Sequence, residues 1–177
     1  MQNIPLFEKW RPKTLFDIVG QDSVINLLSD SLDKGVFHNV YLFEGTHGVG
    51  KTTLARILAK CFSCLNGVSK TPCNKCDACV TIDCCEYPDV IEVDAALFSK
   101  IDDIKNIINT FEYLPIVGKY KVYIIDEIHM FSIYSFNSLL KILESPPNYI
   151  KFFFATTDCN KIPFTILSRC IQFHLKK

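Results

Sequence analysis

The chain has 177 residues, of which 49% are hydrophobic and 21% charged, and its 19 basic residues balance its 19 acidic ones. This length and composition predict one globular domain with a substantial core, and they exclude a disordered chain. No uncharged apolar run approaches the roughly 18–20 residues of a membrane span, and residues 1–5 lack the pattern of a signal peptide. Zero net charge argues against a chain that coats nucleic acid unaided. We therefore expect a cytoplasmic protein with no membrane partner.

Short apolar runs alternate with helical patterns along the chain. The runs are nearly continuous, which is typical of strands buried on both faces, and they occupy residues 40–43, 89–93, 120–125, 151–155 and 171–175. Apolar spacing and capping residues predict helices at residues 22–34, 53–59, 99–111, 132–144 and 163–168. This alternation predicts a three-layer α/β domain with a five-stranded parallel sheet, whose ligands bind at the carboxyl ends of the strands.

Residues 45–52 match the phosphate-binding pattern G-x-x-x-x-G-K-[ST], between a predicted strand and a predicted helix. Glycines let backbone N–H groups approach phosphate oxygens, and the helix amino terminus adds favourable charge. We expect Lys51 to bind the β- and γ-phosphates and the hydroxyl of Thr52 to hold Mg²⁺. The nucleotide-binding residues predicted here are Gly45, Thr46, His47, Gly48, Val49, Gly50, Lys51, Thr52 and Thr53.

Polar residues follow three of the later elements. Asp126 and Glu127 come directly after an apolar run, where Asp126 is placed to support Mg²⁺ and Glu127 to act as a general base on water. Thr156 and Thr157 end the next run, and either hydroxyl could sense a γ-phosphate or orient water. Arg169 precedes the last run, and its spacing is compatible with a surface ion pair or with an arginine directed at phosphate.

Nine cysteines in a chain without an export signal favour free thiols over disulfides. Four of them predict a structural Zn²⁺ knuckle inside an insertion at residues 61–86, whose folding would depend on the metal because it has little apolar content. These four are spaced as Cys64-x8-Cys73-x2-Cys76-x2-Cys79.

An iron–sulfur site is the alternative to zinc. The ferredoxin run requires a fourth cysteine after three residues, followed by proline, whereas Cys84 comes after four and precedes Cys85. We expect Cys84 and Cys85 to be bystanders, although either could substitute as a ligand. Cys61 and Cys170 are expected to be small buried hydrophobic residues.

Together these segments resemble the amino-terminal ATPase domain of the gamma/tau family of bacterial DNA polymerase III, the AAA+ motors of sliding-clamp loaders. The resemblance covers essentially the whole chain. Beyond the phosphate loop and the cysteines, the matching segments lie at residues 9–12, 16–21, 126–130, 138–141, 144–147, 155–158 and 168–170.

The resemblance implies roles that spacing does not. The sheet would have AAA+ order with the strand at residues 40–43 in its centre, and the adenine pocket would be lined around Arg11, Pro12 and Val19. Thr157 would be the first sensor, and Arg169 would be a finger that reaches the γ-phosphate of a neighbouring subunit. The implied cofactors are ATP, Mg²⁺ and one structural Zn²⁺.

The resemblance also implies partners: the delta and delta-prime subunits, further gamma/tau copies, the sliding clamp, and primed DNA through the assembled complex. ATP binding would assemble a spiral that opens the clamp, and primed DNA would trigger hydrolysis. In the family a helical lid and an oligomerisation collar follow this domain. We expect both to be absent from this chain, so that residues 1–177 form the AAA+ domain.

Four other readings share part of this pattern. The delta-prime subunit has a similar fold, insert and Ser-Arg-Cys segment but generally lacks a working phosphate loop, whereas Lys51 and Thr52 are present here. Superfamily-2 helicases share the segment at residues 126–129 but need a second motor lobe, and nucleoside kinases share only the loop. A zinc-knuckle adaptor that binds ATP as a structural ligand remains the non-enzymatic alternative.

Overall fold

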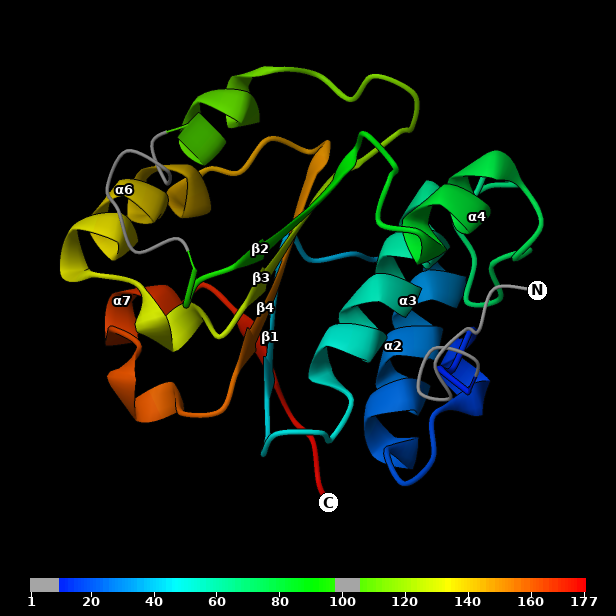
Figure 1. Cartoon of the computed structure of the whole chain (residues 1–177), viewed down its shortest axis with the longest axis horizontal. Coiled ribbons are helices and arrows are strands. Elements are labelled where there is room, and N and C mark those ends of the chain that lie inside the picture. Colours follow the sequence, from blue (N-terminus) through cyan, green and yellow to red (C-terminus); the bar gives the residue numbers. More distant parts are fainter. Residues whose placement is uncertain (1–9, 98–105) are drawn as a thin grey trace.

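The computed structural model describes residues 10–97 and 106–177, and a parallel β-sheet forms the middle layer of this part of the chain (Figure 1). Its strands are β1 (Val40–Glu44), β2 (Val90–Asp94), β3 (Lys121–Asp126), β4 (Ile150–Thr156) and β5 (Ile171–His174), in the order β2-β3-β4-β1-β5. All four pairings are parallel, which confirms the predicted five-stranded sheet. The expectation that β1 is central is wrong, because β4 is the middle strand and β1 lies between β4 and β5.

Burial along the strands follows their position in the sheet. Every residue of β4 is buried, and in β1 and β3 every residue except the last is buried. The edge strands β2 and β5 are mostly half-buried or exposed. The prediction that all five strands are buried on both faces is therefore wrong for the edges, because an edge strand has a neighbour on one side only.

Helices cover both faces of the sheet. In Figure 1, α2 (Asp22–Lys34), α3 (Lys51–Ser63) and α4 (Asp77–Asp83) lie on one side, and α6 (Ile133–Glu144) and α7 (Phe164–Leu167) lie on the other. Short 3₁₀ turns connect them: η1 (Leu15–Asp17), η2 (Thr110–Glu112), η3 (Ile128–Met130) and η4 (Cys159–Lys161). None of the helices in the described ranges is long and apolar enough to cross a membrane.

The helix boundaries agree with the capping residues. The predicted helix at residues 22–34 has those bounds in α2, which stops at Gly35 with a φ of 67°. The hydroxyl of Ser132 accepts a hydrogen bond from the backbone N–H of Ser135 at the start of α6. Of the helix predicted at 99–111, the cap Ser99 and residues up to 105 lie outside the described residues, as does Lys9, while residues 106–109 are helical.

The alternation of side chains along the strands creates two cores. Tyr41, Phe43 and Phe153 face α2 and α3, whereas Leu42, Phe152 and Phe154 face α6 and α7. Each face of the sheet therefore packs against its own helical layer, as expected for a three-layer domain. This packing fixes the carboxyl ends of β1, β3 and β4, where the candidate site lies.

Candidate functional site

The loop between β1 and α3 contains glycines that a larger residue could not replace without strain. A Cβ at Gly45 would lie 2.8 Å from Cγ1 of Val49 and 2.9 Å from the carbonyl oxygen of Leu175. Gly50 has a φ of 99° and precedes the first residue of α3. The backbone N–H of Gly45 donates to the carbonyl oxygen of Thr156 at 3.2 Å, which attaches the loop to β4.

Lys51 lies inside this loop. Its side chain is 5% exposed, and its ammonium donates to the carbonyl oxygens of Gly45 at 2.9 Å and Thr46 at 3.2 Å. A buried ammonium whose hydrogen bonds go to backbone carbonyls can exchange these acceptors for an anion without leaving the loop. The amino terminus of α3 adds partial positive charge at the same place.

Thr52 and Asp126 form the oxygen pair of the site. The hydroxyl of Thr52 donates to Oδ2 of Asp126 at 2.6 Å, and Oδ1 of Asp126 accepts from the backbone N–H of Glu127 at 2.9 Å. Hydroxyl and carboxylate oxygens are ligands that Mg²⁺ accepts, and it commonly binds one or two carboxylates together with substrate phosphates. The pair fits the predicted magnesium ligands.

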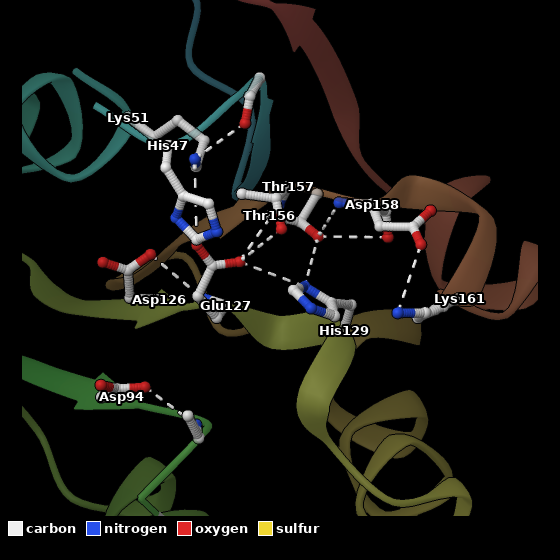
Figure 2. Close-up of polar contacts among 12 residues, drawn as sticks. His47, Lys51, Asp94, Asp126, Glu127, His129, Thr156, Thr157, Asp158 and Lys161 are labelled. Carbon is white, nitrogen blue, oxygen red and sulfur yellow. Dashed lines mark hydrogen bonds and ion pairs between the residues drawn. The ribbon is translucent and has the colours of Figure 1, made fainter. Parts of the chain in front are cut away.

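The two oxygens of the Glu127 carboxylate face different partners (Figure 2). Its Oε2 accepts from the N–H and the hydroxyl of Thr157 at 3.2 and 3.1 Å, and Nδ1 of His129 lies 3.2 Å away. Its Oε1 faces the loop, 3.9 Å from Nζ of Lys51 and 3.6 Å from Nδ1 of His47. The backbone of Glu127 has a φ of 46°, in the left-handed region, which directs the carboxylate toward the loop.

The structure separates the two threonines that the sequence left equivalent. Thr157 contacts Glu127, whereas Thr156 is fully buried and its hydroxyl lies 3.0 Å from Nδ1 of His129 and accepts from the N–H of Asp158. Nδ1 of His129 therefore lies within 3.2 Å of both the Thr156 hydroxyl and Oε2 of Glu127. His129 thus joins Glu127 to the end of β4.

Sequence reasoning missed the part that His129 plays. It sits two residues beyond Glu127 in the turn η3, and its side chain is 10% exposed. The sequence signal for this role is a histidine that follows the carboxylate pair at the end of a strand. Its contact with the end of β4 can be known only from the folded structure. His47, which was predicted as a nucleotide-binding residue of the loop, approaches the same carboxylate from an exposed position.

Arg169 lies outside this group of residues. Its guanidinium donates to Oε1 of Glu144 at 2.8 Å and to the carbonyl oxygen of Thr165, both on the side of the sheet that carries α6 and α7. The arginine side chain is 30% exposed and the glutamate 59%. Arg169 is therefore a surface residue within this chain.

The predicted adenine segment is divided between two environments. Arg11 and Pro12 line a cavity of about 540 Å³ beside α3, whose wall also contains Thr53. Val19 is 92% exposed and does not line that cavity. The neighbouring Ile18 packs instead against the core beneath α2 and α3.

The four predicted zinc ligands come together. The Sγ atoms of Cys64, Cys73, Cys76 and Cys79 all lie within 4.8 Å of one another, and no other group of this kind occurs in the part of the chain that the structure describes. Four thiolates at the usual Zn–S distance of about 2.3 Å sit about 3.8 Å apart, so the cluster fits a tetrahedral metal with a small contraction. All nine cysteines are free, as expected for a metal-binding set without disulfides.

The ligand thiols differ in acidity. Hydrogen bonds from the backbone N–H groups of Lys75 and Cys76 lower the pKa of Cys73 to about 6, while burial raises the pKa of Cys79. The hydrogen bonds to Cys73 therefore favour its thiolate, the form that binds a metal, whereas binding by Cys79 must displace its proton. Burial also raises the pKa of Cys61 to about 12, and this fully buried thiol packs as a hydrophobic residue, as predicted.

The remaining cysteines stand apart from the cluster. Cys84 and Cys85 are exposed and are not part of it, which agrees with their expected role as bystanders. Cys170 is half-buried against the core beside α6 and α7, so it is less buried than predicted.

Comparison with known proteins identifies relatives in one replication complex. A family model described as "DNA polymerase III, delta subunit" matches residues 20–177. The DNA polymerase III subunit tau/gamma of Haemophilus influenzae and the subunit tau of Escherichia coli are each 52% identical over 97% of this chain. The subunit gamma of Buchnera aphidicola subsp. Baizongia pistaciae is 51% identical over the same share. The chain spans 25%, 27% and 46% of these three relatives, respectively.

Solved structures share the fold at lower identity. A DNA polymerase III gamma subunit-related protein of Thermotoga maritima superposes with a TM-score of 0.61 at 20% identity, over 86% of this chain and 45% of that one. The RuvB Holliday junction branch migration motor of the same organism superposes with a TM-score of 0.62 at 23% identity, over 93% and 48%. These similarities confirm the predicted P-loop AAA+ fold.

Proposed function

The chain belongs to the DNA polymerase III subunit family that the matching model and the tau/gamma relatives define, and on that premise we propose that it is an ATP-binding and ATP-hydrolysing motor domain of a clamp loader. The observation that carries the proposal is the convergence of Lys51, Thr52, Asp126 and Glu127 at the carboxyl ends of the strands. An adaptor that merely holds a nucleotide has no need of a carboxylate aimed at the phosphate loop.

In this proposal the phosphates lie in the loop at residues 45–52. Lys51 exchanges its carbonyl acceptors for the β- and γ-phosphates, and the glycines let the backbone N–H groups approach. Thr52 and Asp126 would hold Mg²⁺. When bound, the cation neutralises charge that builds up on the phosphate oxygens.

Glu127 is the proposed general base. Oε2 accepts two hydrogen bonds from Thr157, so Oε1, which faces the phosphate loop, is the oxygen that would accept the proton of an attacking water. Thr157, the proposed first sensor, connects this carboxylate to the end of β4 and can change partner when a γ-phosphate arrives. Arg11, Pro12 and Thr53 line the cavity proposed for the adenine, and Val19 would have to move to reach it.

Arg169 is proposed to act on a neighbouring subunit. It makes no polar contact with the phosphate loop of its own chain among the residues the structure describes, and it is partly exposed. Arginine fingers contribute roughly 10³–10⁵ in rate in related phosphoryl transfers. An isolated copy should therefore bind ATP but turn it over slowly.

The cysteine cluster is proposed to hold one structural Zn²⁺ that organises residues 61–86. The proposed partners are the other clamp-loader subunits (delta, delta-prime and further gamma/tau copies), the sliding clamp, and primed DNA through the assembled complex. The work of the domain would then be to drive the loading of the clamp onto primed DNA.

Nucleotide titration tests the proposal. The parent chain should bind a fluorescent ATP analogue in a Mg²⁺-dependent way, Lys51→Ala should lose that binding, and the exposed Lys34→Ala should retain it. Glu127→Gln should bind as the parent does but release no phosphate when assembled with the partner subunits, while the exposed Glu86→Gln should remain active. Absence of Mg²⁺-dependent binding in the parent would refute the motor, and binding with no turnover in any assembly would favour the adaptor.

A further inference from the structure

A lysine is buried next to the cysteine cluster. Lys60, in the last turn of α3, is 1% exposed, although an ammonium is costly to remove from water unless it is paired. Its Nζ donates to Oδ1 of Asn74 at 3.0 Å and lies 2.9 Å from Oδ1 of Asp83. Both partners belong to the insertion that carries the thiols. The charge is therefore satisfied only while the insertion is ordered against α3.

These contacts join the three segments that supply the ligands. Cys64 follows α3 directly, and its backbone N–H donates to the carbonyl oxygen of Lys60 at 2.9 Å. Asn74 lies between the ligands Cys73 and Cys76, in a left-handed turn with a φ of 54°. Asp83 ends α4, the helix that carries Cys79. One ammonium thus holds the loop and α4 onto the helix that presents the first ligand.

Besides these contacts the insertion is held by a small apolar cluster and a few other contacts. Ala78 and Ile82 pack with Tyr87, which lies just beyond the insertion, and the backbone N–H of Ser69 donates to the carbonyl oxygen of Cys61 at 3.2 Å. The other lysine contact of the insertion, from Nζ of Lys70 to Oδ2 of Asp33 at 2.6 Å, is a surface pair. Surface pairs of this kind contribute little, whereas groups that orient metal ligands commonly affect metal affinity strongly.

We propose that Lys60 is the positioning residue of the metal site, which holds Cys73, Cys76 and Cys79 within reach of the metal and of Cys64. The inference rests on the proposed metal at the cysteine cluster. The cost of ordering the insertion is met in part before the metal binds, because the hydrogen bond from the ammonium to Asn74 and its ion pair with Asp83 already place the loop and α4. Removal of the ammonium should weaken metal binding without removing any thiol.

Cobalt titration of the metal-free chain tests this, because tetrahedral thiolate coordination of Co²⁺ gives a visible spectrum whose intensity reports occupancy. Lys60→Met should bind Co²⁺ about 10- to 100-fold more weakly than the parent, the range seen when groups that orient metal ligands are removed. Zn²⁺ competition should give the same ratio. Lys70→Met, in the same insertion, should match the parent. Affinity of Lys60→Met within twofold of Lys70→Met would overturn the proposal.

Two further variants keep the test decisive if Lys60→Met folds poorly. Asn74→Gly retains the left-handed backbone but removes the acceptor, and Asp83→Asn removes the charge at a position that is 42% exposed. Each should weaken Co²⁺ binding, and Lys60→Met combined with Asp83→Asn should be no weaker than Lys60→Met alone. Additive losses would instead refute the shared contact. A parent chain that binds no metal would refute the metal site itself. Failure of the metal site is thus distinguishable from failure of the proposed role of Lys60, in which the parent still binds metal.

Discussion

The hydroxyl of Thr52 and the carboxylate of Asp126 meet at 2.6 Å, although 74 positions separate them in the chain. Thr52 belongs to the first turn of α3, and Asp126 is the last residue of β3. The contact joins the helix that follows the phosphate loop to the carboxyl end of β3. Two oxygens of the type that Mg²⁺ accepts therefore converge before any cation is bound.

Substitution of Asp126 should separate cation binding from loop structure. We expect Asp126→Asn to weaken the Mg²⁺-dependent part of ATP-analogue binding by about 10- to 100-fold, the range typical for groups that hold or orient a metal. The matched control is Asp94→Asn, because Asp94 is the register partner of Asp126 on β2 but its carboxylate accepts from the backbone of Ala96. Equal losses in both variants, measured by fluorescence titration with and without Mg²⁺, would contradict the assignment.

His129 should affect turnover rather than binding. His129→Leu removes the polar ring nitrogen that lies 3.2 Å from Oε2 of Glu127, so the base is less well placed, and we expect kcat to fall about 10-fold, a part of the roughly 10²–10⁴ that a positioned base contributes. KM should stay within about twofold of the parent value, since the phosphate loop is untouched. His129→Asn, which keeps a donor, should recover part of the rate in steady-state phosphate release by the assembled complex. His38→Leu serves as the control, because His38 is exposed and precedes β1 at the end of the strand away from the phosphate loop. A fall in KM and kcat together would argue for a structural role of His129 instead.

Much of this fold could be predicted because its signals are local. The apolar runs of β3 and β4 are long, and Gly35 and Ser132 mark helix ends that depend on a single residue. Spacing alone left Thr156 and Thr157 equivalent, and only the family resemblance favoured Thr157. Successive residues of an extended chain point to opposite sides, so the packing decides which hydroxyl meets Glu127. The buried Lys60 could not be predicted, since its partners are 14 and 23 positions away.

A second buried lysine gives a prediction about pH. Lys151, on β4, is 3% exposed and donates to Oδ1 of Asn39 at 2.6 Å, and burial, with a contribution from Lys119, lowers its pKa to about 8. The unfolded chain, with a lysine pKa near 10.4, holds this proton between about pH 8 and 10.4 while the folded chain releases it. The free energy of unfolding should therefore rise with pH across this window, by up to about 3 kcal/mol from this group.

Urea unfolding of the parent and of Lys151→Met at pH 7.5 and pH 9.5 measures that contribution. The difference between the two proteins should shift in favour of the parent at the higher pH, because Met cannot titrate. Other groups that titrate in this range cancel in the comparison. The exposed Lys161→Met should follow the parent, and a difference that stays constant with pH would show that the pKa of Lys151 is not lowered.

Arg169 should matter only between subunits. Within one chain it forms a partly exposed pair with Glu144, which is worth about 0–1 kcal/mol, so Arg169→Ala should unfold near the parent midpoint and bind ATP analogue equally well. In an assembly that mixes variant and parent copies, phosphate release should fall in proportion to the number of interfaces at which alanine replaces Arg169. Glu144→Gln breaks the same pair but leaves the arginine in place, so it should keep its activity in the assembly. If both variants lose activity equally, Arg169 serves the fold through Glu144 and does not reach a neighbouring phosphate.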